Sequence, residues 1–149
     1  MLFERIESEG LAHYSYLVGH GKEALVIDPR RDCQVYVDKE SKSGFRIKHI
    51  LETHRNEDYV IGSPELASRT EAQVWHADAQ MEYQYGQPVE DGQTWQVGRL
   101  KVKAIHTPGH TPDSLCVLAL EAGAPGKLVT GDTLFVGKVG GTGFGEDAR

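Results

Sequence analysis

The sequence has few cysteines, no polybasic stretch and no long apolar run, and each absence narrows the class of protein. Cys33 and Cys116, the two cysteines among 149 residues, stand in unrelated contexts, so we expect free thiols in a reducing compartment. The net charge is −6, which argues against nucleic acid or an anionic membrane as a partner. The first residues lack the basic and apolar regions of a signal peptide. We therefore expect a cytoplasmic protein without membrane association.

Several enzyme signatures are also missing. The sequence contains no Gly-x-Ser-x-Gly nucleophile elbow, no Walker loop and no dinucleotide-binding fingerprint. Neither cysteine has a histidine partner that the sequence identifies. The sequence therefore does not favour an enzyme with a serine or cysteine triad, a P-loop nucleotidase or a dinucleotide-dependent dehydrogenase.

What is present is the composition of an ordinary globular domain, 39% hydrophobic and 26% charged, and we expect residues 1–149 to form a single domain. Strands and helices are mixed in the first half, and Gly and Pro turns separate strands in the second. The expected strands are 2–6, 14–18, 23–29, 47–51, 73–76, 94–97, 100–105, 114–120 and 127–129. The expected helices are 33–43 and 63–70, the second capped by Ser63 with Pro64 at its first position, and 136–149 is expected to be a loop.

Ligand-type side chains follow three of the expected strands. Thr53-His54-x-x-x-Asp58 follows the apolar run 47–51, and His110 lies in a Pro-Gly-His turn after the strand 100–105. Asp132 follows the strand 127–129. Open α/β sheets place their chemistry at strand ends. Imidazole and carboxylate groups suit zinc or non-haem Fe(II), and the lack of cysteine ligands argues against a structural zinc site.

These motifs resemble the metallo-β-lactamase superfamily, and more closely its persulfide dioxygenase branch, which is related to glyoxalase II. The resemblance rests on the segments 26–29, 51–54, 107–114 and 131–137 and covers nearly the whole chain. It implies an αββα sandwich fold, of mixed α/β class. The superfamily's second sheet and covering helix come largely from residues that would follow Arg149, so we expect the C-terminal part of the fold to be missing.

The motif also departs from the superfamily pattern. His-x-His-x-Asp-His would place histidines at 56 and 59, where this chain has Asn56 and Tyr59. Neither side chain is a good replacement ligand. The superfamily's last histidine ligand would lie beyond Arg149. A binuclear zinc site of the hydrolase type is therefore not expected. The family's Gly-Arg loop after Gly-Asp is also replaced, by Gly140-Gly141.

Persulfide dioxygenases use a single iron, and the resemblance assigns its ligands to His54, His110 and Asp132. It implies oxidation of a persulfide such as glutathione persulfide to sulfite and the thiol, with Fe(II) as cofactor and zinc as the alternative. Asp58 and Tyr59 are the remaining catalytic candidates. Asp58 would accept a hydrogen bond or hold a ligand histidine in one tautomer, and Tyr59 would offer its hydroxyl to substrate or oxygen.

Two other functions remain open at this point. One is a glyoxalase II-like zinc enzyme that hydrolyses a thioester, and the other is a catalytically inactive protein that binds sulfur compounds or serves as a scaffold. An uncovered sheet edge would favour a homo-oligomer, and members of this branch often carry a rhodanese domain, so a rhodanese-type partner is a further expectation.

Overall fold

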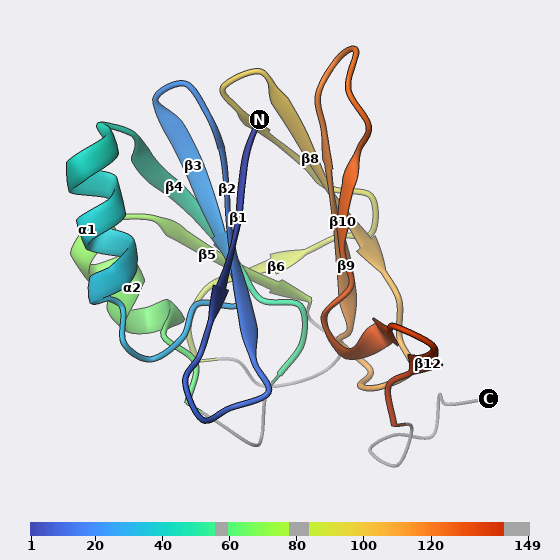
Figure 1. The fold of residues 1–149 in the computed structure, drawn as a ribbon. Helices are drawn as coiled ribbons and strands as arrows, with labels where there is room; N and C mark the ends of the chain where they lie inside the picture. Colours follow the sequence, from blue (N-terminus) through green and yellow to red (C-terminus); the bar gives the residue numbers. More distant parts are fainter. Residues whose placement is uncertain (56–59, 78–83, 142–149) are drawn as a thin grey trace.

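Two β-sheets face each other, and two helices lie on the outer side of the first sheet (Figure 1). The computed structural model describes residues 1–55, 60–77 and 84–141. The six-stranded first sheet runs in sequence order: β1 (Leu2–Glu7), β2 (Tyr14–His20), β3 (Glu23–Ile27), β4 (Arg46–Leu51), β5 (Gln73–Ala77) and β6 (Gln87–Val89). Its strands are antiparallel from β1 to β3 and parallel from β3 to β6.

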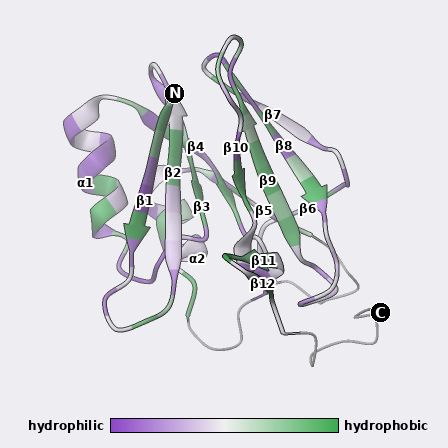
Figure 2. Cartoon of the chain, turned by 45° about the vertical axis from the view of Figure 1, so that its right-hand side comes forward, coloured by the Kyte–Doolittle hydropathy of each residue, from purple (hydrophilic) through white to green (hydrophobic). Residues whose placement is uncertain are grey.

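The second sheet is antiparallel throughout. Its order is β10-β9-β8-β7, from β10 (Lys127–Val129), β9 (Leu115–Leu120), β8 (Leu100–His106) and β7 (Thr94–Val97). A 3₁₀ turn, Gly131–Thr133, follows β10 and leads into a small hairpin of β11 (Leu134–Phe135) and β12 (Lys138–Val139). Figure 2 shows this hairpin at the lower end of the space between the two sheets.

Helices α1 (Gln34–Ser43) and α2 (Ser63–Thr70) each connect two parallel strands, the usual form of such a crossover. They bury Tyr36 and Leu66 against Val26, Ile47 and Ile50 of the first sheet. The helix α1 ends where Gly44 adopts a left-handed conformation (φ 71°), in which an amino acid with a Cβ would be strained.

The main core lies between the two sheets. Alternate residues of the facing strands meet there, because successive side chains of a strand point to opposite faces. The buried members include Val18, Leu25, Ile27, Leu51, Trp95, Val97, Val102, Val117 and Val129. The outer face of the second sheet is less covered: Leu120 and Leu128 are 38% and 51% exposed.

Most expected elements are confirmed, with shifts of one or two residues at their ends. The expectation that Ser63 caps α2 is wrong: Gly62 is the N-cap residue, no side chain caps the helix, and Ser63 is buried. The strands β6 and β11 were not expected. The loop expected from 136 onward contains β12 within its described part.

The mixed α/β class and the helix–sheet–sheet layering agree with the expected sandwich. Both helices of residues 1–55, 60–77 and 84–141 lie on the first sheet, so these residues supply three of the four expected layers. None of the helices in the described part is both long and apolar enough to cross a membrane.

Candidate metal centre

His54 lies just beyond the C-terminal end of β4, where the chain leaves the first sheet. The loop that carries it is tied to the second sheet, since the Leu115 amide donates to the Thr53 carbonyl oxygen at 2.6 Å. The Arg55 amide donates to the carboxylate of the fully buried Asp113 at 2.8 Å. These bonds on both sides of His54 fix its backbone, and its side chain is only 7% exposed.

A hydrogen-bonded chain orients the His54 ring. The Asp28 carboxylate accepts the Thr53 amide at 2.7 Å and the Thr53 hydroxyl at 2.6 Å. The same hydroxyl oxygen lies 3.0 Å from Nδ1 of His54. Because the hydroxyl donates its hydrogen to Asp28, its oxygen accepts from Nδ1–H of His54. This arrangement places the hydrogen on Nδ1 of His54, so Nε2 is the unprotonated nitrogen, the kind that binds a metal.

His110 lies in the turn between β8 and β9. Backbone and side-chain bonds close this turn, with the Thr107 amide donating to the Ser114 carbonyl at 2.8 Å and the Thr111 amide to the Ser114 hydroxyl at 3.0 Å. The Nδ1 of His110 lies 2.7 Å from the Gly141 carbonyl oxygen. A carbonyl only accepts, so Nδ1 carries the hydrogen and Nε2 of His110 is also left with a lone pair.

Asp132 lies in the 3₁₀ turn after β10, next to a glycine that the site requires. Gly131 adopts φ 48°, and a Cβ there would overlap the side chain of Thr53. The close approach of this turn to Thr53 brings Asp132 to the end of β4. A Cβ on Gly140 would likewise overlap the Asp132 carbonyl oxygen, so a second glycine allows the chain to pass behind Asp132.

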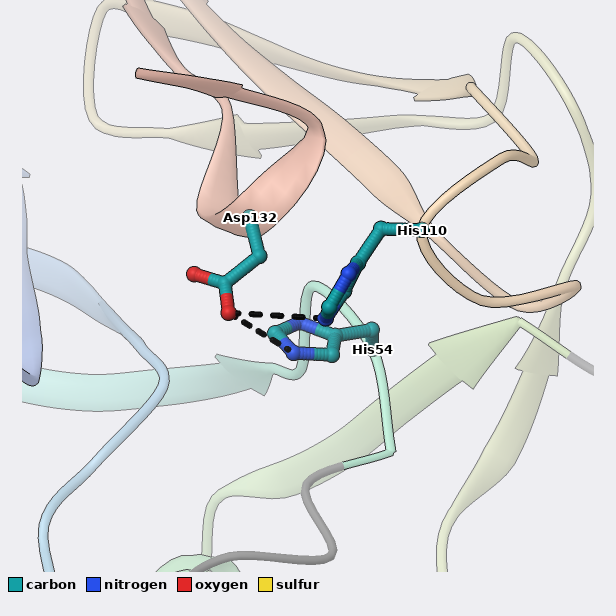
Figure 3. Close-up of side chains that lie close together, drawn as sticks. All are labelled: His54, His110 and Asp132. Carbon is teal, nitrogen blue, oxygen red and sulfur yellow. Dashed lines mark ion pairs between the residues drawn. The ribbon is translucent and has the colours of Figure 1, made fainter. Parts of the chain in front are cut away.

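The three side chains converge from three separate strand ends (Figure 3). Oδ2 of Asp132 lies 3.7 Å from Nε2 of His54 and 3.5 Å from Nε2 of His110. All three ligand atoms lie within 4.8 Å of one another. Ligand atoms bound about 2.1 Å from one metal ion are separated by about 3.0 to 3.4 Å. The group therefore needs only small side-chain movements to fit a metal ion.

The electrostatics of the group also suit a metal. Burial lowers the pKa of His54, against the opposing effect of the Asp132 carboxylate. His54 is therefore neutral near pH 7, which is the form of imidazole that binds metal. Burial raises the pKa of Asp28 to about 7, although the two hydrogen bonds from Thr53 favour its ionised form. The donor set is two imidazole nitrogens and one carboxylate oxygen.

A pocket of about 460 Å³ opens beside this group. One wall comes from the β1–β2 hairpin and the other from the turn after β10 and from β11. The described residues that line it are Arg5, Ala12, His13, Tyr14, Tyr16, Asp28, His54, Thr130, Gly131, Asp132, Leu134, Phe135 and Val136. Because His54 and Asp132 are part of its lining, a molecule in the pocket can reach the metal-binding group.

The structure thus brings His54, His110 and Asp132 together, as the sequence indicated. Asp58 and Tyr59, the two catalytic candidates, lie outside the described residues. Sequence reasoning did not give a role to Asp28 or to the Gly141 carbonyl, both of which orient a histidine. The segment that contains Asp28 was part of the resemblance, but the pairing of Asp28 with Thr53 joins residues 25 positions apart.

The family follows from the sequence comparison. The family model for the metallo-beta-lactamase superfamily matches residues 9–148. The chain belongs to the metallo-beta-lactamase superfamily. The resemblance seen in the motifs is therefore confirmed, and solved members of the superfamily share the fold.

A crystal structure of a metallo-beta-lactamase from Staphylococcus aureus superposes with a TM-score of 0.83 at 32% identity and covers 94% of this chain. That of ETHE1 from Myxococcus xanthus gives 0.82 at 30% identity and covers 97%.

Curated relatives of this superfamily member include enzymes of more than one kind. A hydroxyacylglutathione hydrolase from Acidiphilium cryptum is 33% identical over 83% of the chain. An atrochrysone carboxyl ACP thioesterase from Cryptosporiopsis sp. is 32% identical over 80% of it. The chain spans only 49% and 38% of the lengths of these two relatives. It spans 45% and 63% of the two solved chains.

Proposed function

We propose that this superfamily member is a mononuclear Fe(II) enzyme that oxidises a thiol persulfide, such as glutathione persulfide, to sulfite and the thiol. The donor set carries the proposal: two imidazole nitrogens and one carboxylate oxygen, all within 4.8 Å of one another. This is the ligand set of the non-haem Fe(II) oxygenases. The presence of Asn56 and Tyr59 where the superfamily pattern has histidines favours one metal over two.

His54, His110 and Asp132 would hold Fe(II), which would supply the redox chemistry that lets dioxygen oxidise the persulfide sulfur. The residues of the chain position the reactants. The Nδ1 bonds to Thr53 and to the Gly141 carbonyl hold both imidazole rings in the orientation that directs Nε2 toward Asp132. The pocket that opens on His54 and Asp132 gives the substrate a way in. The balanced reaction converts persulfide, dioxygen and water to thiol, sulfite and protons.

The roles that we propose for Asp58 and Tyr59 rest on the sequence. We assign Asp58 the role of accepting a hydrogen bond next to the metal site, and Tyr59 a hydroxyl that contacts the substrate or oxygen. Both residues belong to the segment that follows His54 directly. Their roles are separable from metal binding, because neither belongs to the proposed ligand set.

The test is metal content, followed by turnover. Protein loaded anaerobically with Fe(II) and Zn(II) in competition is expected to hold about one iron per chain and to consume oxygen when glutathione persulfide is added. His54→Ala is expected to lose both. His20→Ala is the matched control, because His20 lies at the opposite end of β2 from the pocket and pairs with Glu121 at 3.6 Å.

Three results would contradict the proposal. Equal iron content in the wild type and His54→Ala would remove the assigned site. No bound metal in the wild type would instead favour the hypothesis of a catalytically inactive sulfur-binding or scaffold protein. Two zinc ions per chain would show that Asn56 and Tyr59 do not prevent a binuclear site.

The second candidate is a zinc enzyme that hydrolyses a thioester. It is favoured by the names of the curated relatives, a hydroxyacylglutathione hydrolase and an ACP thioesterase, whereas the ETHE1 structure fits the first candidate. An acylglutathione thioester separates the two. Zinc-loaded protein that hydrolyses it, together with iron-loaded protein that does not consume oxygen with persulfide, would establish the hydrolase.

A further inference from the structure

The pocket has a wall with a different chemistry from its metal-binding end. The wall consists of Arg5 on β1 and of Tyr14 and Tyr16 on β2. Arg5 pairs directly with Tyr16 across the two strands, so both side chains point to the same face of the sheet. The same row continues into the core between the sheets through Phe3, whose ring lies 5.6 Å from that of Tyr16.

Along this face of β1 and β2, the apolar side chain of Phe3 in the core is followed by Arg5, Tyr14 and Tyr16 at the pocket. The guanidinium of Arg5 lies 4.5 Å from the centre of the Tyr14 ring, a cation–π contact that restrains an otherwise flexible side chain. Among the described residues, no carboxylate forms an ion pair with Arg5. Its positive charge is therefore positioned on the pocket wall and available to an anion.

The pocket is polarised as a result. Asp28 and Asp132 supply carboxyl groups at the metal-binding end, and Arg5 is the only Lys or Arg among the described lining residues. Leu134, Phe135 and Val136 form the opposite side, and all three are well exposed. Such a pocket suits a molecule with an anionic end, an apolar middle and a group that reaches His54 and Asp132.

We propose that Arg5, Tyr14 and Tyr16 form a subsite for the carboxylate tail of the substrate, so that the protein selects carboxylate-bearing thiol derivatives. This inference rests on the proposed function for the identity of the reacting end, but the recognition of the tail is independent of the reaction. A guanidinium binds a carboxylate through two parallel hydrogen bonds, and phenol hydroxyls can add further donors. The Arg5 side chain positions the substrate and is not a catalytic residue.

The test measures binding without turnover. The probes are S-methylglutathione, whose sulfur is blocked, and its diethyl ester, which lacks both carboxylates. Calorimetric titration of the metal-loaded protein is expected to show about 10- to 100-fold tighter binding of the acid, the usual effect of a charge-assisted hydrogen bond. Arg5→Met is expected to abolish this preference. Tyr14→Phe keeps the ring beneath the guanidinium and is expected to reduce the preference by less.

The matched control is Arg99→Met, which removes an exposed arginine from the β7–β8 turn at the far end of the molecule and should leave the preference intact. Thermal unfolding of each variant checks that the fold is retained. The proposal is overturned if Arg5→Met binds S-methylglutathione as tightly as the wild type does. It is also overturned if the wild type binds acid and ester equally.

The two proposals fail in different ways. A protein that holds no iron but prefers the acid keeps the subsite and loses the dioxygenase. A protein that oxidises persulfide with equal KM in the wild type and Arg5→Met keeps the dioxygenase and loses the subsite. In an active enzyme, Arg5→Met should raise KM for glutathione persulfide while kcat changes little, because the tail contact is the same in the ground and transition states.

Discussion

Asp28 accepts two hydrogen bonds from Thr53, one from its amide at 2.7 Å and one from its hydroxyl at 2.6 Å. The pair connects the end of β3 to the end of β4, and through the Thr53 hydroxyl it reaches Nδ1 of His54 at 3.0 Å. A buried carboxylate therefore determines which nitrogen of His54 carries the hydrogen. The orientation of the metal-binding group depends on a residue that is not itself a ligand.

Thr53→Val should weaken metal binding by about 10- to 100-fold, since it removes the acceptor of Nδ1–H while nearly preserving the shape of the side chain. Thr70→Val is the matched control: Thr70 is also buried, and its hydroxyl donates to the Leu66 carbonyl at 2.7 Å within α2. Metal titration of both variants is the measurement. Equal metal affinity in the two variants would show that the Thr53 hydroxyl does not orient His54.

His110→Ala should abolish metal binding, whereas Tyr59→Phe should spare it. His110 supplies one of the three converging donor atoms, and Tyr59 is assigned no bond to the metal. The measurement is the metal content of both variants, determined by elemental analysis after anaerobic loading with Fe(II). Unchanged metal content in His110→Ala would contradict the ligand assignment, and loss of metal in Tyr59→Phe would make Tyr59 a ligand.

Gly131→Ala should destabilise the fold more than Gly123→Ala does and should also weaken metal binding. Both glycines have positive φ, 48° and 78°, so both alanine variants carry backbone strain of about 1 to 2 kcal/mol. Only at Gly131 would the added Cβ also overlap a neighbour, Thr53, and displace the turn that carries Asp132. Chemical unfolding and metal titration compare the two. Equal free energies of unfolding in the two variants would mean that the turn shifts without cost.

The stability of the metal-free protein should depend on pH through Asp28. Burial raises its pKa from 3.8 to about 7, so between these values the folded chain keeps a proton that the unfolded chain has lost. The stabilisation is complete below about pH 4 and is lost as the pH rises to about 7, with an upper limit of about 4 kcal/mol. The free energy of unfolding of chelator-treated wild type should therefore fall relative to that of Asp28→Asn as the pH rises across this range. A difference in the free energy of unfolding between the two proteins that stays constant from pH 4 to pH 8 would contradict the raised pKa of Asp28.

Local patterns in the sequence determined most of the elements, whereas the choice of three metal ligands came from the family resemblance of the motifs. The strands β7 and β10 and the helix α2 have the bounds that the sequence predicted, because hydrophobic periodicity and Gly or Pro turns act over a few residues. The strand β6 was missed because Gln87–Val89 is short and becomes a strand by pairing with β5. The Ser63 cap was wrong because tertiary contacts fix Gly62, whose amide donates to the Pro29 carbonyl at 2.8 Å.

The sequence by itself placed His54, Asp58, His110 and Asp132 after strands, and the family resemblance of these motifs narrowed the metal ligands to two histidines and one carboxylate. Only the tertiary structure decided that their donor atoms lie within 4.8 Å of one another, because this depends on how the two sheets face each other. It also decided that Asp28 and Gly141 orient the rings and that Arg5 shares a pocket with Asp132. Such relations join residues far apart in the chain, and periodicity and motif spacing carry no information about them.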